Sequence, residues 1–532
     1  MEAFDYIIVG GGTAGCILAE RLSASGKQRV LVIEAGSAPR SPWIPIPAGF
    51  SKLLVNQRYN WRLTSTPEAT TANRAIAIPR GRGLGGSSLI NGMIYVRGQE
   101  QDYDRWADAG AQGWDWKSIE PYFKKLECCA FGDSTRGQSG PMHIEEVAER
   151  CKIGEASLAA AQSAGWSLNH DYNSGDQTGF GYYQVLQHNR RRWSAYDAYL
   201  RPALSRPNLT VQTDAQVQQL IFNGKHCSGV HYLHKGQALS VTADAEVILC
   251  AGSVHNPQLL ELSGVGQPEH LKSLGIEPVH ALNGVGENYQ DHYATRMNWQ
   301  VRNAITINER SRGLRLIREL MSYATQRRGI LSLGTGLVYG FVSTPYAKYG
   351  PDIQFFIVDA SYANAAERVL DKTPGMTIGV TQLQPESKGT IHAVDNRINT
   401  PPAICPNFLS SGDDANALAS GMQLARHLVA QTPLKSLLVE EMNPGIQVND
   451  PRTLIQWARE TGQTIYHPVG TCRMGREDDQ QAVVDKELKV RGLSGLRIAD
   501  ASVMPSMVSG NTQGAVMMVA EKAADMITRK AY

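Results

Sequence analysis

The chain lacks a long apolar run, a bias toward charge of one sign, and clusters of basic residues. No apolar stretch approaches the 18 or more residues that a membrane-spanning helix needs. The formal net charge is only +2, so the electrostatic basis for binding nucleic acid is missing. These absences argue against a transmembrane segment and against a nucleic-acid partner.

The cysteines lack the spacing of a metal site or a redox pair. Eight are present, at positions 16, 128, 129, 151, 227, 250, 405 and 472, without a C-x-x-C pair. Because a glycine-rich strand begins at Phe4, we expect no signal or transit peptide ahead of it and reduced thiols throughout. We therefore expect no metal and a cytoplasmic location, with peripheral attachment to the inner face of a membrane left open.

The size and composition of the chain are those of a multidomain globular protein. With 532 residues it exceeds the size at which one core stops growing, so two or more interlocked domains are expected. Its 42% apolar and 19% charged residues are ordinary for this class.

The first chemical signal is a strand, a glycine-rich turn and a helix at the N-terminus. Asp5–Val9 reads as a buried strand, Gly10-x-Gly12-x-x-Gly15 follows, and residues 14–25 have helical spacing. Gly10 permits the tight turn, Gly12 lets backbone approach a phosphate, and Gly15 lets the helix pack on the strand. The pattern predicts a site for a dinucleotide pyrophosphate at the helix N-terminus.

A second strand, residues 29–34, ends in Glu34, which is placed to accept hydrogen bonds from an adenosine ribose. Its carboxylate argues against a ribose 2′-phosphate. This motif alone does not separate NAD from FAD.

Further motifs separate them. A second glycine cluster is Gly81-Arg82-Gly83-Leu84-Gly85-Gly86-Ser87-Ser88-Leu89-Ile90-Asn91, and a further motif follows at Gly252-Ser253-Val254-His255-Asn256-Pro257. Later come Gly284-Val285-Gly286-Glu287-Asn288 and Asp500-Ala501-Ser502. In these motifs, and in their order, the chain resembles the glucose–methanol–choline (GMC) family of FAD oxidoreductases, departing at Asn256, where Ser or Thr is usual.

The resemblance implies a mixed α/β fold: a doubly wound, Rossmann-like FAD-binding domain built from discontinuous segments, and a substrate domain with an antiparallel sheet. We expect residues 1–155, 206–295 and 459–532 to form the FAD-binding domain, and 156–205 and 296–458 the substrate-binding domain. Periodicity agrees: it predicts strands at 209–212, 217–222, 229–233, 246–252, 352–358, 376–380 and 496–500, and a helix over 514–527.

The resemblance also implies the residues that contact FAD. The expected set is Gly10, Gly12, Thr13, Ala14, Gly15, Glu34, Ala35, Arg82, Gly85, Gly86, Ser87, Asn91, Gly92, Val217, Ala251, Asp500, Ala501, Asn511 and Thr512. Some relatives attach flavin through a histidine in the stretch corresponding to 88–91, and this chain has none there. Non-covalent FAD is therefore expected.

The catalytic prediction rests on His467, in Tyr466-His467-Pro468-Val469-Gly470-Thr471, and on Asn511. Oxidising an alcohol removes a hydride, which flavin N5 can take, and a hydroxyl proton, for which histidine is the suitable base near neutral pH. By resemblance, His467 is that base and Asn511 fixes the substrate oxygen. We interpret His292 as ordering a loop against the cofactor; Phe355 and Phe356 could line a pocket or belong to the core.

The favoured activity is FAD-dependent oxidation of an alcohol, most simply a primary one, with a quinone or another non-oxygen carrier as electron acceptor. The first alternative is an oxygen-using alcohol oxidase, and a less favoured one is a flavin-containing lyase. The sequence leaves the alcohol and the oligomeric state open.

Overall fold

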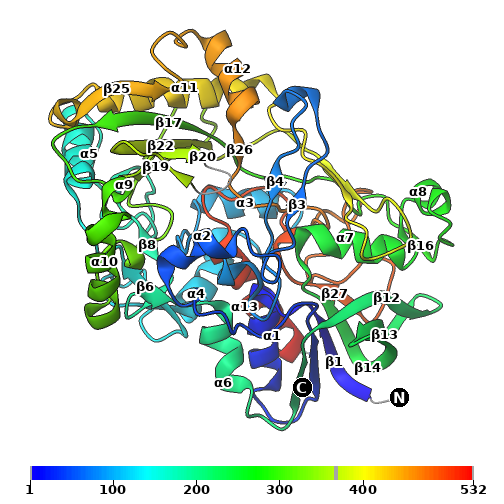
Figure 1. Cartoon of the computed structure of the whole chain (residues 1–532). Helices are drawn as coiled ribbons and strands as arrows, with labels where there is room; N and C mark the ends of the chain where they lie inside the picture. Colours follow the sequence, from blue (N-terminus) through cyan, green and yellow to red (C-terminus); the bar gives the residue numbers. More distant parts are fainter. Residues whose placement is uncertain (1–2, 365–368, 530–532) are drawn as a thin grey trace.

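A computed structural model describes residues 3–364 and 369–529, and two large sheets organise it (Figure 1). In the first, β11 (Leu209–Gln212), β2 (Val30–Ile33), β1 (Ala3–Val9) and β14 (Gln237–Leu249) lie side by side in parallel. β27 (Leu496–Ile498) adds a parallel pairing to β14, and β13 (His226–His234) and β12 (Ala215–Asn223) continue antiparallel from its first half. The predicted parallel sheet and its hairpin are confirmed.

The second sheet is antiparallel throughout. Its order is β25 (Leu438–Asn443), β17 (Tyr293–Val301), β22 (Gly375–Gln382), β19 (Ile353–Val358), β18 (Val338–Val342) and β7 (Gly179–Tyr182), with β26 (Gln463–Thr464) paired to β17. The predicted mixed α/β class, with an antiparallel sheet in its second part, is therefore correct.

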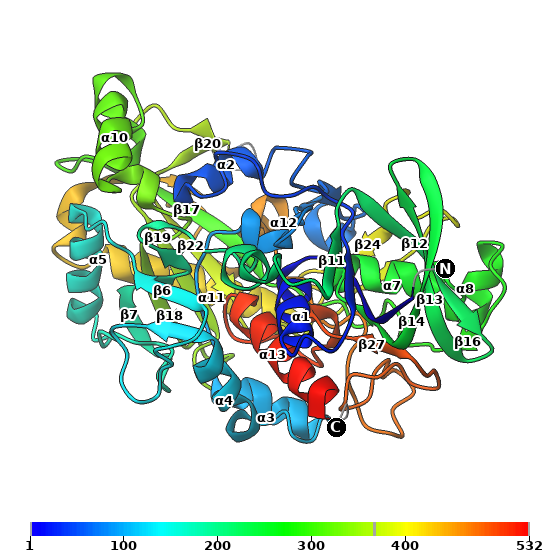
Figure 2. The same cartoon turned by 90° about the horizontal axis from the view of Figure 1, so that it is seen from below.

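Two helices from opposite ends of the chain pack side by side, α1 (Thr13–Ser23) and α13 (Gln513–Arg529), and α1 packs on β1 and β2 (Figure 2). Arg21 on α1 donates to Glu521 on α13, with Nη2 2.7 Å from Oε1 and Nε 3.0 Å from Oε2. Glu521 is fully buried and also pairs with Lys125, whose Nζ lies 3.1 Å from Oε2, so two cations neutralise this buried carboxylate. This pairing brings the N-termini of both helices to one place.

The remaining longer helices cover the sheets and the edges of the molecule. They are α3 (Glu100–Asp108), α4 (Trp116–Leu126), α5 (Lys152–Ser163), α7 (Gly252–Leu262), α10 (Gly313–Gln326), α11 (Gly412–Val429) and α12 (Pro451–Thr461). Within the described ranges, none of the helices combines the length and the apolar character that crossing a bilayer requires.

Element boundaries differ from the predicted ones by a few residues. α1 ends at Ser23, two residues before its predicted end, and α13 runs to Arg529. One segment lies elsewhere than expected: residues 196–203 pack against α1, and Tyr199 donates to Glu521 at 2.9 Å. We propose the domain division given under Sequence analysis, except that residues 196–203 belong to the FAD-binding domain instead of the substrate-binding domain.

Candidate functional site

The parallel strands bring the glycine-rich loops together. β1 and β14 are in register, with Val9 opposite Leu249, and β27 ends beside them with Ile498 opposite Leu249. Because parallel strands end at the same edge of a sheet, the residues that follow β1, β14 and β27 meet there. These are the turn after Val9, the start of α7 and the Asp500 loop.

The glycine turn has the geometry its spacing predicts. Gly10 has φ of +100°, and a Cβ there would lie 2.6 Å from the Cys250 carbonyl oxygen. A Cβ on Gly15 would lie 2.0 Å from the Gly10 oxygen, which explains why helix and strand need a glycine at that contact. At Gly12 a Cβ would have its nearest neighbouring atoms 3.9 Å away, so this backbone faces open space. A ligand can therefore approach the helix N-terminus at Gly12.

Glu34 joins the two glycine clusters. Its carboxylate accepts from the backbone N–H of Gly11 at 2.8 Å, of Gly36 at 2.7 Å and of Gly83 at 3.0 Å. The side chain is buried and does not line the cavity described next. Its ribose contact stays a prediction; the contacts present in the structure hold the loops to each other.

A cavity of about 290 Å³ opens between the carboxyl edge of the first sheet and one face of the second. Many of the predicted site residues line it: Gly12, Thr13, Ala14, Gly86, Ser87, Asn91, Gly92, Ala251, His467, Asp500, Ala501, Asn511 and Thr512. The predicted residues that lie outside the lining are Gly10, Gly15, Glu34, Ala35, Arg82, Gly85 and Val217. Among these, Gly85 donates its N–H to the Gly11 oxygen at 2.7 Å, a contact between loops.

The chain's departure at Asn256 has a structural role. Its Oδ1 accepts from the Ala251 N–H at 3.0 Å, and its Nδ2 donates to Asp500 Oδ2 at 2.8 Å. The amide thus fastens the loop after β14 to the loop after β27 with two donated bonds, to Asp500 Oδ2 and to Ser502 Oγ at 3.0 Å, whereas a Ser or Thr hydroxyl has only one proton to donate.

The cavity wall contains the donors that a dinucleotide would need. Thr13 and Gln513, the first residues of α1 and α13, contact each other through Gln513 Nε2 and Thr13 Oγ1 at 3.1 Å, so two helix N-termini open on the same space. The buried Nε atom of Arg80, which lines the cavity, has no hydrogen-bond partner among the described residues. This unpartnered donor and the paired helix N-termini fit an anionic pyrophosphate and an electron-rich ring.

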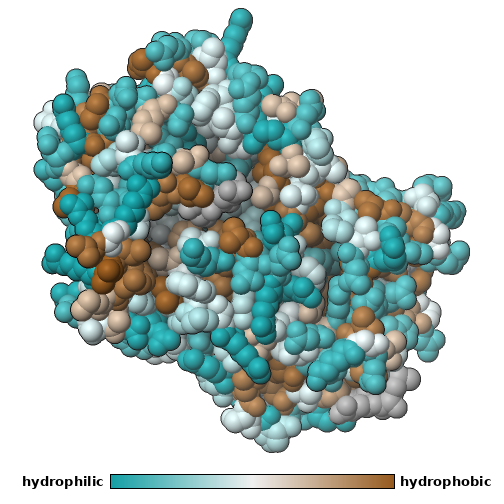
Figure 3. All heavy atoms as spheres, in the orientation of Figure 1, coloured by the Kyte–Doolittle hydropathy of each residue, from teal (hydrophilic) through white to brown (hydrophobic). Residues whose placement is uncertain are grey.

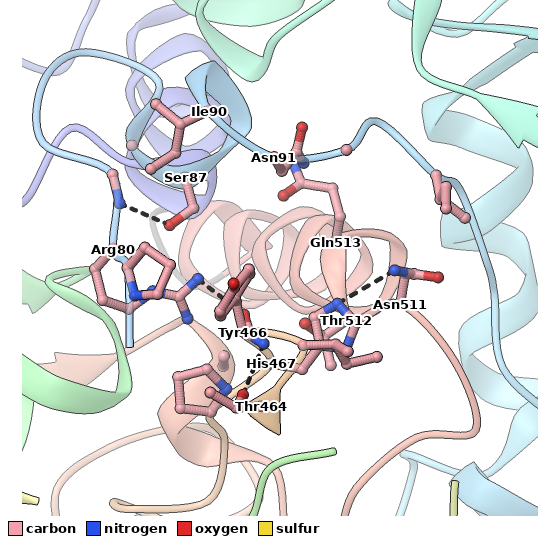
Figure 4. Close-up of a pocket in the computed structure, with 18 of the residues that line it drawn as sticks. Arg80, Ser87, Ile90, Asn91, Thr464, Tyr466, His467, Asn511, Thr512 and Gln513 are labelled. Atoms are coloured by element: carbon pink, nitrogen blue, oxygen red, sulfur yellow. Dashed lines mark hydrogen bonds between the residues drawn. The ribbon is translucent and has the colours of Figure 1, made fainter. Parts of the chain in front are cut away.

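His467 and Asn511 meet at this cavity, as Figure 4 shows, next to Thr512 and Gln513 at the start of α13. Asn511 Nδ2 lies 3.3 Å from His467 Nε2. The backbone of His467 is held by Asp291, whose Oδ1 accepts its N–H at 2.8 Å. Residues 44 positions apart in sequence therefore form one hydrogen-bonded pair.

His292 has a different place from the one interpreted from sequence. It lies against His467, with the two Nδ1 atoms 3.0 Å apart, and its Nε2 lies 3.2 Å from the Leu383 oxygen. The sequence signal was available, because His292 follows directly on the Gln290-Asp291 pair, but nothing local pointed it toward His467.

These contacts favour one tautomer of His467. A carbonyl can only accept, so the contact with the Leu383 oxygen favours a proton on Nε2 of His292, which leaves Nδ1 as an acceptor toward His467. In that arrangement His467 donates from Nδ1, and its Nε2 is a lone pair facing Asn511 and the cavity. The contacts thus place the basic nitrogen of His467 at the cavity.

Burial keeps both imidazoles neutral. It lowers the pKa of His292 to about 4 and, with the nearby His292 and Arg80, lowers the pKa of His467 well below its usual 6.5. Burial also raises the pKa of Asp291 to about 6. His467 is therefore unprotonated, and able to accept a proton, at neutral pH.

The opposite wall comes from one face of the second sheet. The partners Arg296, Gly379 and Phe356 form a row across β17, β22 and β19, and the next residues on that face, Ala294 and Thr381, line the cavity too. Because side chains alternate along a strand, Phe356 faces the cavity and Phe355 is fully buried in the core. Phe356 therefore lines the pocket and Phe355 belongs to the core, so each of the two interpretations holds for one residue.

Comparisons with known proteins identify the family. The N-terminal and C-terminal models of the GMC oxidoreductases match residues 4–294 and 385–520. The chain belongs to the GMC oxidoreductase family. It is 37% identical to an alcohol dehydrogenase (acceptor) of Pseudomonas putida over 99% of this chain and 96% of that one, and 37% identical to the mitochondrial choline dehydrogenase of Homo sapiens over 99% and 90%.

Among solved structures, it resembles one that concerns FAD modification in a formate oxidase of Aspergillus oryzae RIB40. The TM-score is 0.92 at 26% identity, over 99% of this chain and 98% of that one. This GMC oxidoreductase is therefore an FAD enzyme, and the cofactor predicted from the glycine clusters is correct.

We expect the purified enzyme to release intact FAD when denatured by acid or heat, because residues 88–91 contain no histidine. Cys250 and His255 are among the residues with nucleophilic atoms that line the cavity, so the test extends to them. Burial raises the pKa of the Cys250 thiol well above its usual value, which keeps it protonated and unreactive. Yellow colour that stays with the precipitated polypeptide would refute non-covalent binding.

Proposed function

We propose that this enzyme oxidises an uncharged primary alcohol to the aldehyde and passes the electrons to a non-oxygen acceptor such as a quinone. The observation that carries the proposal is the position of His467 Nε2, 3.3 Å from the Asn511 amide nitrogen at the cavity between the FAD loops and the second sheet. When bound, FAD supplies the hydride acceptor at its N5 atom.

Residues of the chain remove the hydroxyl proton and stabilise the substrate oxygen. The substrate hydroxyl donates to His467 Nε2, which takes the proton as the C–H bond breaks. The Asn511 amide donates to the same oxygen while it carries alkoxide character. The bond between Asn511 and His467 is long at 3.3 Å, so a hydroxyl can insert between them at low cost.

The charge of the cavity favours an uncharged alcohol over a quaternary ammonium alcohol such as choline. Arg80 and Arg296 line it, and among the described lining residues the only acidic side chain is Asp500. Asp500 accepts from the Gly252 N–H at 2.7 Å and from Asn256, so it is committed to the loops of the FAD side. Among the described lining residues, a trimethylammonium group would therefore meet Arg80 and Arg296 and no acidic side chain other than Asp500.

An anaerobic titration tests the proposal. We expect a neutral primary aliphatic alcohol to bleach the flavin absorbance at least about tenfold faster than choline, given charges of one sign within a few ångströms. The Arg296→Glu variant should shift the ratio of the two rates toward choline by about tenfold or more. Arg296→Gln is the matched control for the other contacts of this side chain. Faster bleaching by choline in the wild type would contradict the substrate class.

Reoxidation of the reduced flavin in the same experiment distinguishes a dehydrogenase from an oxidase or a lyase. Admitting oxygen after reduction should restore the yellow colour slowly, and a soluble quinone should restore it fast. Rapid recovery with oxygen would make the enzyme an oxidase, and a flavin that stays oxidised with every alcohol while the alcohol is cleaved would make it a lyase.

His292 tests the tautomer argument. His292→Leu removes the acceptor for His467 Nδ1–H, and losing one such hydrogen bond should slow flavin reduction roughly 5- to 30-fold. His292→Asn puts an amide oxygen near the position of Nδ1 and should recover most of the rate, with the half-saturating alcohol concentration similar in all three proteins. Equal rates in the Leu and Asn variants would mean that His292 only fills space.

A further inference from the structure

Helix α10 exposes its apolar side chains. Leu314 is 85% exposed, Ile317 53%, Leu320 48% and Met321 64%. The spacing of Leu314, Ile317 and Met321 places them along one side of the helix, with Leu320 beside them. We call these four residues the α10 stripe. On the opposite side Tyr323 is buried, so the helix is amphipathic and its apolar stripe faces solvent.

The segment that carries the stripe is strongly basic. Residues 309–328 contain six arginines and two glutamates. Both glutamates are in ion pairs, Glu319 with Arg310 at 2.7 Å and Glu309 with Arg315 at 3.1 Å. Residues 309–328 therefore have more positive than negative side chains, and the arginines lie before, within and after the helix.

The helix lies at the edge of the molecule (Figures 1 and 2), and both of its ends contact segments that lead to cavity residues. At its start, Arg312 donates to the Asp371 oxygen at 2.6 Å, next to β21 (Val369–Leu370). β21 pairs with β20 (Tyr362–Asn364), whose Tyr362 lines the cavity.

Beyond its end, Ile330 packs in a cluster with Ile46, four residues before the cavity residue Phe50. Figure 3 shows hydrophobic side chains gathered over α10 at the left margin of this face.

We propose that α10 docks on the surface of an anionic phospholipid bilayer, lying in the interfacial plane with its stripe among the acyl chains and its arginines at the headgroups. An exposed apolar face, a basic rim and a position at the edge of the molecule are the combination that suits such an interface. A second copy of the chain fits less well, because a two-fold contact pairs a patch with itself and would oppose the arginines of both copies.

Docking has a consequence for the site. Because both ends of α10 adjoin segments that line the cavity, the bound enzyme would present its cavity near the lipid, where an aliphatic alcohol or a quinone is concentrated. This consequence rests on the proposed function, whereas the docking does not.

Co-sedimentation of the FAD-loaded enzyme with vesicles tests the proposal. We expect binding to phosphatidylcholine vesicles that contain phosphatidylglycerol, little binding to phosphatidylcholine alone, and release at high salt. Leu314→Ser, Ile317→Ser and Met321→Ser combined should lower the bound-to-free ratio by about tenfold or more, since each apolar side chain loses its burial. The matched control combines Leu233→Ser and Leu239→Ser, also exposed but on β13 and β14 at the other end of the molecule, and should bind as the wild type does.

Several results would overturn the proposal: no binding by the wild type, equal binding by the stripe variant and the wild type, or equal loss in the control. A concentration-dependent dimer that the stripe substitutions abolish, without vesicle binding, would assign the stripe to a second copy. Alcohol-dependent flavin reduction in vesicle-free solution should be unchanged in the stripe variant, so failure of docking and failure of the proposed function give different results.

Discussion

His467→Ala should slow the anaerobic reduction of bound flavin by a primary alcohol by about 10²–10⁴-fold, the range typical of losing a general base. The reason is positional: its Nε2 is the lone pair that the hydrogen bonds of His292 and Asn511 present at the cavity. The variant should keep its FAD, because the donors at the helix N-termini and the glycine loops are untouched. Stopped-flow measurement of the flavin absorbance, with each rate corrected for bound FAD, decides the matter.

The pH dependence supplies an independent check on the same residue. Only unprotonated His467 can accept the hydroxyl proton, so the rate should fall as pH drops through its pKa. Burial, His292 and Arg80 lower that pKa, so the acid limb should lie below pH 6.5. His467→Ala should lose this limb, and added imidazole should recover part of its rate. Wild-type speed in the variant, or an acid limb unchanged by the substitution, would place the base elsewhere.

The sequence predicted those features that depend on contiguous residues. Gly10 and Gly15 are required by the backbone within one turn, so their spacing was sufficient to predict the loop. The pairing of His467 with Asn511 followed from two local motifs and the family resemblance. That β1 and β2 belong to a parallel sheet followed from buried apolar strands and the helix after the first of them, whereas the strand order was not predicted.

Other features depend on register and on contacts between distant segments, which no local pattern encodes. His292 and His467 are 175 residues apart, and only the meeting of two loops makes one the acceptor for the other. Whether Phe355 or Phe356 faces the cavity depends on the register of β19 against β22. Glu34 ends the expected strand, yet its carboxylate binds Gly83 of the second glycine cluster, 49 residues away.

Asn511→Ala should lower the reductive rate by a factor that corresponds to roughly 1–4 kcal/mol of transition-state stabilisation, and leave reoxidation by a quinone largely intact. The orientation of the amide supports this. Tyr183 donates to the Phe355 oxygen at 3.1 Å and so accepts from Gln354 Nε2 at 3.0 Å; the same Nε2 lies 3.4 Å from Asn511 Oδ1. With Oδ1 occupied by a donor, Nδ2 is the atom turned toward His467 and the substrate oxygen.

Two controls keep the Asn511 result interpretable. Asn511 precedes α13, whose N-terminus lines the FAD side of the cavity, so each rate must be corrected for bound flavin. Asn511→His restores a ring N–H donor at the same place and should recover a substantial part of the rate, while Asn511→Asp, which puts an acceptor where the donor was, should be at least as slow as Asn511→Ala. The order His, then Ala, then Asp is what hydrogen-bond donation to a developing alkoxide requires. A reductive rate in Asn511→Ala within about twofold of wild type, too small for a lost donor, would mean that the residue only shapes the loop.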